Sequence, residues 1–367
     1  MRYMKLVLLL WVGSLLIACG EKQQTGGEQV EVDKSKIYRW KMVTTWPANF
    51  PVLQEAPERL ADKVRSLSGG RLDIRVYASG ELVPALEVFD AVSQGVAEMG
   101  HGTPYYWAGK VPAAQFFSSV PFGMTSAGAQ AWINHGGGLE LWRELYEPFN
   151  LMPFPIGTTG IQMGGWFNKR IDSVADIKGL RMRIPGLGGK VLKRAGGNPI
   201  LISGGELYTA LERGTIDATE WVGPSHDLRM GLYRAADYYY YPGWHEPSTT
   251  LELIVNKDKW NSLPADLQAI VEEVTVSVGS WSMTIMEHYN SVALEELRGK
   301  KTLQVLPFPD DVLETLKEMT DEALDEEAEK DANFKRVYES YTAFREKYQK
   351  WRDISERAMI NTEDVAD

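Results

Sequence analysis

Residues 38–77 read YRWKMVTTWPANFPVLQEAPERLADKVRSLSGGRLDIRVY, and this stretch decides the fold class. Apolar and polar side chains alternate over its first six residues, which is the pattern of a half-buried strand. Apolar residues then recur at helical steps of three and four, at Ala56, Leu60, Val64 and Leu67. The glycines at 69 and 70 end that helix, and alternation resumes at Leu72. Strand, helix and strand in this order predict an α/β fold with a largely parallel sheet.

The same cadence continues on both sides of an aromatic, glycine-rich stretch that ends near Pro155. Before that point we predict a short helix at 87–94 and an extended segment at 96–101. After it we predict strands and helical segments at 160–168, 173–177, 180–184, 187–195, 205–213 and 216–221. A long apolar strand at 249–256 then carries the chain back to the first domain. Two α/β domains joined by more than one crossing place a small-molecule site in the cleft between them.

The chain changes character from Asp310 onward, where charge is dense and the pattern is helical. Six large side chains recur at steps of three or four, as on one helix of roughly 25 residues: Phe334, Val337, Tyr341, Phe344, Tyr348 and Trp351. This stripe has two interpretations. It packs on the domains as a brace, which we favour, or part of it forms the seam of a homodimer.

The N-terminus, MRYMKLVLLLWVGSLLIACG, has the features of a secretory signal. Two basic residues precede 13 apolar or small residues, 6–18, which fall short of the roughly 20 that span a bilayer. Residues 16–19, Leu-Ile-Ala-Cys, resemble the lipobox of bacterial lipoproteins. That resemblance implies removal of the signal peptide 1–18 and a lipid on Cys19. The polar residues 19–36 are predicted to be a flexible tether, so this anchor is the expected contact with a membrane.

Composition limits the classes of partner. The 367 residues carry a formal net charge of −11, which repels nucleic-acid phosphates, and we therefore predict no nucleic-acid partner. A single cysteine excludes an intramolecular disulfide and a thiolate metal cluster. A 24% share of charged residues excludes a multi-pass membrane protein.

The motifs of common enzyme classes are incomplete. Residues 186–191, GLGGKV, lack the third glycine of a dinucleotide fingerprint and the Ser or Thr that follows the lysine of a P-loop. Residues 223–227, GPSHD, lack the last glycine of a nucleophile elbow. The five histidines are scattered, and His245-Glu246 lacks the second histidine of a zinc helix. We therefore predict that the chain is not an enzyme.

Six strings occur in a specific order: SGGRLDIRVY at 68–77, GEL at 80–82, VSQGVAEM at 92–99, IKGLRMRIPG at 177–186, ELYTALERGTIDATEW at 206–221 and LIVNKDKW at 253–260. Together, over roughly Tyr38 to Phe308, they resemble the solute-binding subunit of TRAP (tripartite ATP-independent periplasmic) transporters. The pair Glu220-Trp221 and the string WHEP at 244–247 are similar to the branch that binds 2-oxo acids or lactate with a cation.

This resemblance implies a two-domain type II periplasmic-binding-protein fold with a long C-terminal helical region. The expected segments are α/β domain I at 37–158 and 252–305, α/β domain II at 159–251, and C-terminal helices at 306–367. A protein of this family closes on its ligand in the periplasm and hands it to a sodium-driven membrane permease.

Arg183 is the residue that we expect to hold an acid. It ends an apolar strand just before a Pro-Gly turn, and its planar guanidinium can bind a carboxylate through two parallel hydrogen bonds. Arg181 lies on the same face of the strand, so alternation does not separate the two arginines, and the family pattern favours Arg183. The resemblance adds further substrate-binding residues, Gln162, Tyr105 and Tyr106, although packing explains one of the tyrosines equally well. Residues near strand ends or turns complete the candidates: Trp46, Asn198 and Trp244.

Glu220 and Glu246 pose an electrostatic problem, because each would repel a carboxylate ligand by about 4 kcal/mol at 4 Å and an effective dielectric of 20. A cation between them removes the repulsion. Two carboxylates and the main-chain carbonyl of Trp221 suit a hard ion such as Na⁺ or Ca²⁺, and the family branch uses such a site. Without the resemblance, two solvated glutamates are the simpler interpretation, because no spacing rule marks them.

The expected function is therefore capture of a small organic acid, a 2-oxo acid such as pyruvate, or lactate, with a bridging cation, and its delivery to a TRAP permease. Two alternatives stay open. A sugar-binding lipoprotein is suggested by the 12 Trp and 16 Tyr residues, whose faces stack on sugars. A secreted metal-dependent hydrolase using Glu220 and Glu246 is weaker, because no nucleophile or base with a partner is found.

Overall fold

The computed structural model describes residues 35–363, which belong to one compact unit. The predicted signal peptide, Cys19 and nearly all of the predicted tether lie outside these residues and stay predictions. Within the described range, no helix combines the length and the apolar composition needed to cross a membrane.

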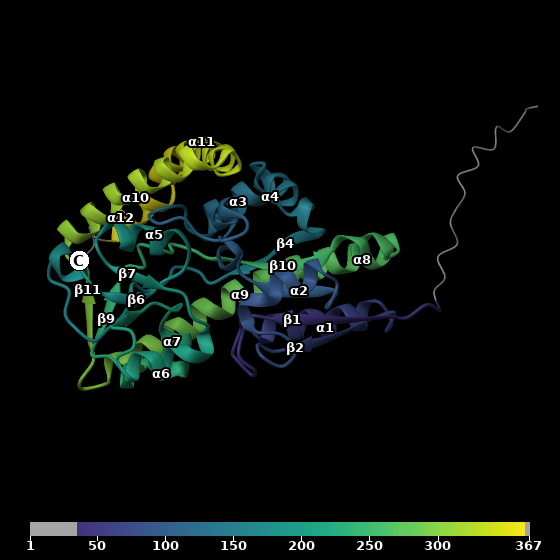
Figure 1. Ribbon diagram of the computed structural model, residues 1–367, viewed down its shortest axis with the longest axis horizontal. Helices are drawn as coiled ribbons and strands as arrows, with labels where there is room; N and C mark the ends of the chain where they lie inside the picture. The colour runs from purple at the N-terminus through teal and green to yellow at the C-terminus, as the bar shows by residue number, and fades with distance from the viewer. Residues whose placement is uncertain (1–34, 364–367) are drawn as a thin grey trace, which may run out of the picture. The chain divides into compact units, whose positions relative to one another are not determined.

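The first sheet has five strands in the order β2-β1-β3-β10-β4 (Figure 1). Strands β1, β2 and β3 are parallel, and β10 runs antiparallel to β3 and β4. The bounds are β1 Tyr38–Thr44, β2 Leu72–Tyr77, β3 Met99–Gly102, β4 Leu151–Thr158 and β10 Thr250–Asn256. The predicted strand-helix-strand opening is confirmed: α1 spans Glu55–Leu67 and buries Ala56, Leu60 and Val64 in the core that the first sheet shares.

The second sheet has six strands in the order β11-β9-β5-β8-β6-β7. Strands β6, β7 and β8 are parallel, β11 is parallel to β9, and β5 runs antiparallel to β8 and β9. The bounds are β5 Gly165–Phe167, β6 Arg181–Arg183, β7 Asn198–Ile200, β8 Ala218–Thr219, β9 Tyr238–Tyr241 and β11 Gln304–Pro307. The two sheets and their helices confirm the predicted α/β class.

Helices surround and connect the two sheets (Figure 1). The remaining α-helices are α2 Val88–Ser93, α3 Ser126–His135, α4 Gly138–Tyr146, α5 Gly186–Arg194, α6 Leu207–Glu212, α7 Pro224–Met230, α8 Lys257–Ser262, α9 Ala265–Arg298, α10 Asp310–Lys330, α11 Ala332–Ile354 and α12 Glu356–Glu363. Short 3₁₀ turns are η1 Ala85–Glu87, η2 Pro104–Trp107, η3 Pro112–Phe117, η4 Glu147–Phe149, η5 Val174–Ile177, η6 Gly204–Glu206 and η7 Leu232–Arg234.

The predicted strand at 160–168 is wrong in its first half, because β5 covers Gly165–Phe167 alone. Residues 160–164 form an irregular crossing between the sheets, and Gly160 has a positive φ of 71° that a regular strand does not adopt. Gln162 therefore sits on a loop, with its backbone carbonyl bonded to the N–H of Gly243. The predicted strand at 216–221 likewise shrinks to the two residues of β8.

Two strands carry the chain across and back, as the sequence predicts. Strand β4 ends at Thr158 before the chain reaches β5, and β10 returns to the first sheet, where it pairs with β4. The division into domains at the predicted residues stays a prediction. One difference is clear, because β11, which begins at Gln304, pairs with β9 of the second sheet, whereas we predicted 252–305 with the first domain.

Helix α9 is the physical reason for that difference. Its 34 residues correspond to a length of about 51 Å, and it packs on β4 and α1 of the first sheet and on α7 beside the second. The helix therefore takes the chain from one sheet to the other a third time. At its contact with β4, two backbones meet directly: a Cβ on Gly279 would lie 3.0 Å from the backbone nitrogen of Gly157, and Gly157 itself has a φ of 114°.

The aromatic stripe predicted near the C-terminus lies on α11, which packs on η3, α3 and α4. Phe334, Val337 and Tyr341 are buried, and the hydroxyl of Tyr341 accepts a hydrogen bond from the backbone N–H of Met124 at 2.9 Å. This supports the brace interpretation for the first half of the stripe. Trp351, at its end, is 62% exposed. The homodimer stays a prediction.

Candidate functional site

The site begins where two parallel strands of the second sheet end. Arg183 is the last residue of β6 and aligns with Thr219, the last residue of β8, so that Glu220 follows directly beside it. The backbone N–H of Glu220 donates to the carbonyl of Arg183 at 3.3 Å. Carboxyl ends of parallel strands are the usual ligand edge of an α/β sheet. The local pairing thus brings two predicted site residues, one cationic and one anionic, to that edge.

Arg183 is completely buried, and each of its three guanidinium nitrogens donates a hydrogen bond. Nη1 forms an ion pair with a carboxylate oxygen of Glu220, which is also buried. Nη2 donates to the hydroxyl of Tyr106 at 3.3 Å, and Nε donates to the carbonyl of Ile202 at 3.4 Å. The guanidinium carbon lies 5.2 Å from the ring centroid of Trp221, in cation–π range. Arg183 is therefore held rigidly from every side.

Arg181, the arginine that alternation did not separate from Arg183, has a different environment. Its guanidinium pairs with Asp217 at 2.6 Å, and the side chain is 46% exposed. It lies at the start of β6, two residues from the ligand edge. Depth along the strand separates the two arginines, and this agrees with the choice of Arg183.

Gln162 and Glu246 form the second half of the site. The amide nitrogen of Gln162 donates to Glu246 Oε2 at 2.8 Å and to the hydroxyls of Thr159 and Thr249 at 3.1 and 2.9 Å. The hydroxyl of Thr249 also donates to Glu246. These bonds fix the amide so that its oxygen, Oε1, is turned away from them. The crossing loop, rather than a strand, places Gln162 here.

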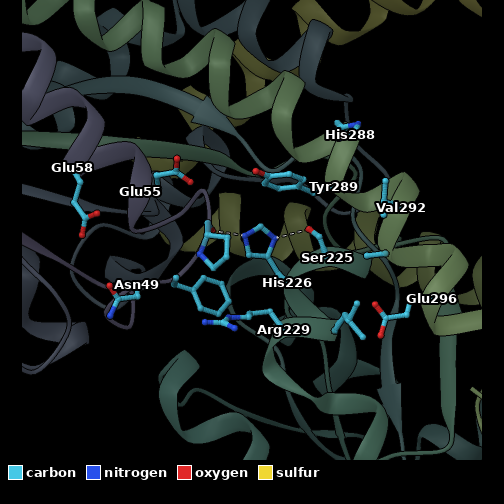
Figure 2. A pocket seen from close by; sticks show the side chains of 14 residues that line it. Asn49, Glu55, Glu58, Ser225, His226, Arg229, His288, Tyr289, Val292 and Glu296 are labelled. Carbon is cyan, nitrogen blue, oxygen red and sulfur yellow. Dashed lines mark hydrogen bonds between the residues drawn. The ribbon is translucent and has the colours of Figure 1, made fainter.

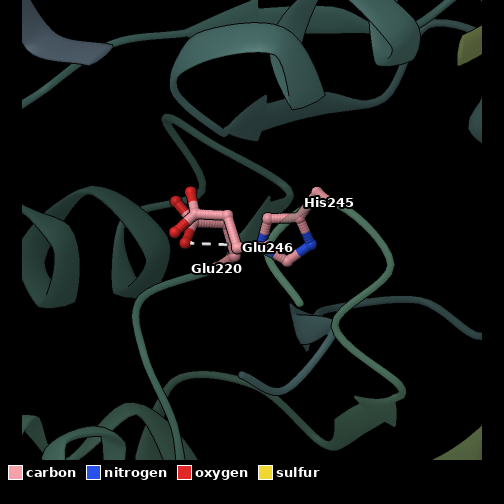
Figure 3. A group of neighbouring side chains, drawn as sticks. All are labelled: Glu220, His245 and Glu246. Carbon is pink, nitrogen blue, oxygen red and sulfur yellow. Dashed lines mark ion pairs between the residues drawn. The ribbon is translucent and has the colours of Figure 1, made fainter. Parts of the chain in front are cut away.

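Glu220, His245 and Glu246 lie together (Figure 3), and one ligand atom from each falls within 4.8 Å of the others. All three are buried. Within residues 35–363, several buried polar atoms here have no hydrogen-bond partner: Glu220 Oε2, Gln162 Oε1, Trp221 Nε1 and both ring nitrogens of His245. Buried polar atoms are normally paired, so this concentration marks a place that is built to receive a ligand or an ion.

Aromatic side chains enclose the charged residues. Trp46 meets Trp221 edge to face at 6.4 Å and Tyr106 at 6.5 Å, and Tyr105 meets Tyr106 at 4.9 Å. Burial raises the pKa of both tyrosines, which keeps their hydroxyls neutral. The structure therefore brings together four aromatic residues that are candidates from the sequence: Trp46, Tyr105, Tyr106 and Trp221.

The structure gives the two remaining candidates, Trp244 and Asn198, different environments. Trp244 stacks on Phe122 at 5.7 Å and belongs to the core of the second sheet, so its contacts are those of packing. Asn198 is exposed at the start of β7, and its amide donates to the carbonyl of Gly179 at 3.1 Å. That bond fastens a turn, and the structure gives Asn198 no contact with the buried charges described above.

The electrostatics of the site favour an added positive charge. Burial, and next the nearby carboxylate of Glu220, raise the pKa of Glu246 to about 7. Burial is the largest single influence on Arg183 and opposes its charged form, but the negative field of Glu220, the two tyrosines and Glu246 together raises the pKa of Arg183 above its ordinary value. Arg183 thus stays cationic, while Glu246 lacks a cationic partner of comparable strength.

Carboxylate and amide oxygens are the ligands that Na⁺ and Ca²⁺ take in proteins, and the donor set here fits such an ion. Glu220 Oε2 and Gln162 Oε1 are buried acceptors without a hydrogen-bond donor among the described residues. Residues Glu220, Glu246 and Gln162 would hold the ion. The carbonyl of Trp221 stays the predicted fourth contributor.

A pocket of about 260 Å³ borders this region, with Tyr105, Tyr106 and Gly186 in its wall. A wider pocket of about 780 Å³ lies between the β1–α1 loop, α7 and α9 (Figure 2). The described residues that line it include none of the predicted ligands, and its carboxylates, those of Glu55, Glu58 and Glu296, disfavour an acid. We therefore do not assign the acid to the wider pocket.

Sequence reasoning missed His245 and Thr249. His245 lacks the second histidine of a zinc helix, yet folding brings it to Glu220, 25 residues earlier. The signal that could have identified His245 was its direct neighbour Glu246, a predicted ion ligand. Thr249 had no signal, because a hydroxyl three residues after a glutamate is common in loops.

Known proteins similar to this chain are bacterial solute-binding proteins. Residues 42–331 match the DctP family model, described as bacterial extracellular solute-binding protein, family 7. A monocarboxylate 2-oxoacid-binding periplasmic protein of Nostoc sp. is 43% identical over 346 residues, which cover 94% of this chain and 93% of that protein.

Crystal structures of TRAP periplasmic solute-binding proteins are also similar. That of Colwellia psychrerythraea, with bound calcium and pyruvate, is 44% identical, has a TM-score of 0.87, and covers 89% of this chain and 100% of its own. That of Pseudoalteromonas atlantica, with bound sodium and pyruvate, is 43% identical, with a TM-score of 0.87 and coverage of 89% and 99%. Since the family model spans most of the chain and these relatives match nearly all of it, the chain belongs to the DctP family of TRAP solute-binding proteins.

Proposed function

We propose that this chain binds a small 2-oxo monocarboxylate such as pyruvate, together with Ca²⁺ or Na⁺, in the enclosed site around Arg183. The observation that carries the proposal is a buried arginine beside two buried carboxylates, with Glu220 Oε2 and Gln162 Oε1 left without a hydrogen-bond partner among the described residues. The relatives with bound pyruvate and calcium or sodium support this choice of ligands. The family is one of transport proteins rather than enzymes, which weighs against the hydrolase.

Charge balance favours joint binding of the acid and the ion. Arg183 contributes one positive charge, and the ionised carboxylates of Glu220 and Glu246 contribute two negative charges. A monocarboxylate adds one more negative charge, so a net charge of −2 must be neutralised in a buried site. Ca²⁺ neutralises it fully and Na⁺ by half. Because unpaired charges are costly when buried, the acid alone is disfavoured.

The ion also frees Arg183 for the ligand. In the described structure Glu220 already occupies Nη1 of the guanidinium, so a ligand carboxylate must replace Glu220 there. This replacement is unfavourable unless Glu220 gains another positive partner, and the cation is that partner. Arg183 can then bind the ligand carboxylate through two parallel hydrogen bonds. Each of the two ligands consequently strengthens the binding of the other by the same factor.

Other side chains have supporting roles. Gln162 supplies an oxygen to the ion while its amide nitrogen keeps Glu246 in place. Tyr106, which is already within hydrogen-bond distance of Arg183, orients the guanidinium, and Tyr105 closes the wall beside it. Trp221 covers the face of the guanidinium and excludes water, which strengthens the charged contacts.

Isothermal titration of the wild-type protein with pyruvate tests the proposal. Affinity should rise by about tenfold or more when Ca²⁺ or Na⁺ is added to protein that was exhaustively chelated in Na⁺-free buffer. The same titrations are carried out with lactate, dicarboxylates and a neutral sugar. Equal affinity with and without the cations would contradict the linkage, and binding of the sugar alone would favour the sugar-binding alternative.

We also propose that the protein works in the periplasm, tethered by a lipid on Cys19, and that it delivers its ligand to a TRAP permease. Family membership supports the periplasmic location and the permease. The lipobox-like residues before Cys19 support the anchor. Cys19→Ser should release the protein from membranes while pyruvate affinity stays the same. Membrane association that survives the substitution would overturn the anchor.

A further inference from the structure

His245 is the buried residue of the site that carboxylate capture leaves unexplained. It lies between β9 and β10, and both of its ring nitrogens lack a hydrogen-bond partner among the described residues. Nε2 lies 3.5 Å from Glu220 Oε2, which also lacks a hydrogen-bond donor. A buried imidazole without partners costs free energy, so its position calls for a ligand of its own.

Packing, rather than hydrogen bonding, fixes the position of the imidazole. A side chain on Gly188 of α5 would meet the His245 Cβ at 2.9 Å, so the helix backbone lies directly against His245. The ring of Trp244 meets the imidazole edge to face at 5.5 Å, and Trp244 is itself stacked on Phe122. The ring nitrogens thus stay available to bind while the ring is held beside Glu220 and Glu246.

The three side chains offer one nitrogen and two carboxylate oxygens within 4.8 Å of one another (Figure 3). Na⁺ and Ca²⁺ take oxygen ligands and gain little from an imidazole. Zn²⁺ and Co²⁺ bind imidazole and carboxylate together, and three such donors are the usual protein contribution to an open zinc site. The cluster therefore contains an imidazole nitrogen, a ligand that a hard cation does not need.

We propose that His245, with Glu220 and Glu246, forms a site for a borderline divalent transition ion such as Zn²⁺, which competes with the hard cation. This inference rests on the proposed function in one respect, because it uses the same two carboxylates. His245 then sets the ion selectivity of the protein. Ca²⁺ is held by oxygens alone, whereas the transition ion requires the imidazole.

Co²⁺ alone, as a spectroscopic probe for Zn²⁺, tests the proposal on the full chain after metal removal by dialysis against a chelator. The wild-type protein should bind one Co²⁺ with the visible d–d absorption of mixed nitrogen and oxygen ligation, and added Ca²⁺ should remove that absorption. His245→Phe should weaken Co²⁺ binding by about tenfold or more. Its affinity for Ca²⁺ should change by less than about threefold.

Two further variants keep the result decisive. His245→Asn, which offers an amide oxygen in less space, should keep Ca²⁺ binding and lose the Co²⁺ absorption, so a folding defect of the Phe variant does not obscure the outcome. His288 is exposed on α9, and His288→Ala should leave Co²⁺ binding unchanged, which excludes this surface histidine as the ligand.

Two outcomes overturn the inference: Co²⁺ binding that is unchanged in both His245 variants, or Ca²⁺ affinity that falls as far as Co²⁺ affinity. Failure of the proposed function looks different, because wild-type pyruvate affinity would then not respond to Ca²⁺ or Na⁺ whatever residue stands at 245.

Discussion

Arg183→Ala should abolish measurable pyruvate binding, with a loss of about 100-fold or more. The guanidinium is the buried cation that the ligand carboxylate would contact, and the substitution also leaves Glu220 without its ion-pair partner. Two negative groups would then face each other in an enclosed site, where water cannot screen them. Calorimetric titration in saturating Ca²⁺ measures the loss. A neutral sugar held by stacking would stay bound, so the same variant separates the two ligand classes.

Arg183→Lys tests whether Arg183 binds the ligand through two parallel hydrogen bonds or through its positive charge alone. Lysine keeps the positive charge but loses the planar pair of donors, and we expect clearly weaker binding than in the wild type. Arg181→Ala is the matched control, because it removes an exposed arginine–carboxylate pair two residues away on the same strand. It should bind pyruvate normally. Wild-type affinity in the Arg183→Lys variant would show that the bidentate contact is wrong.

Glu220→Gln should have the second largest effect, on the slope of pyruvate affinity against cation concentration. The amide keeps the shape of the side chain but loses the charge that attracts the ion, so the slope should flatten. In cation-free buffer the variant should bind pyruvate more tightly than the wild type, by about tenfold. The reason is that a neutral amide holds Arg183 less strongly than the carboxylate does, and one repulsive charge is gone.

Titrations at a series of Ca²⁺ concentrations measure both effects in one experiment. Asp217→Asn removes the carboxylate of the neighbouring exposed pair and should leave the slope as in the wild type. Unfolding by urea checks that the buried substitution leaves the fold intact. A wild-type slope in Glu220→Gln would remove Glu220 from the ion site.

The sequence predicts best where local periodicity and burial agree. The opening strand, α1 and β2 follow from alternation and helical spacing, because each element buries one face on the same core. Leu67 shows the limit of this reasoning. It continues the helical spacing of Leu60 and Val64, yet it lies at the last turn of α1 and is 64% exposed. Spacing indicates a face of a helix but does not tell where the neighbouring sheet ends.

Site residues were predictable to the extent that a resemblance or a strand end marked them. Arg183 and Glu220 are adjacent because β6 and β8 pair, a contact between residues 37 positions apart that no local pattern contains. Gln162 reaches Glu246 from an irregular loop, where strand alternation has no meaning. His245 joins them through contacts of the folded chain alone. Long-range pairing therefore decides the site, and local sequence decides the elements that carry it.

Helix α9 contacts the first sheet and α7 beside the second, so any separation of the two sheets must deform this helix. Near its first half it is fastened to β4 by the glycine contact at Gly279, and further along Asn290 accepts hydrogen bonds from the backbone and hydroxyl of Ser225 on α7. The 11 helical steps from Gly279 to Asn290, about 16 Å of helix, lie within one continuous helix. We expect this span to bend when the buried ligand enters or leaves, so that its stiffness influences how readily the protein returns to its enclosed shape.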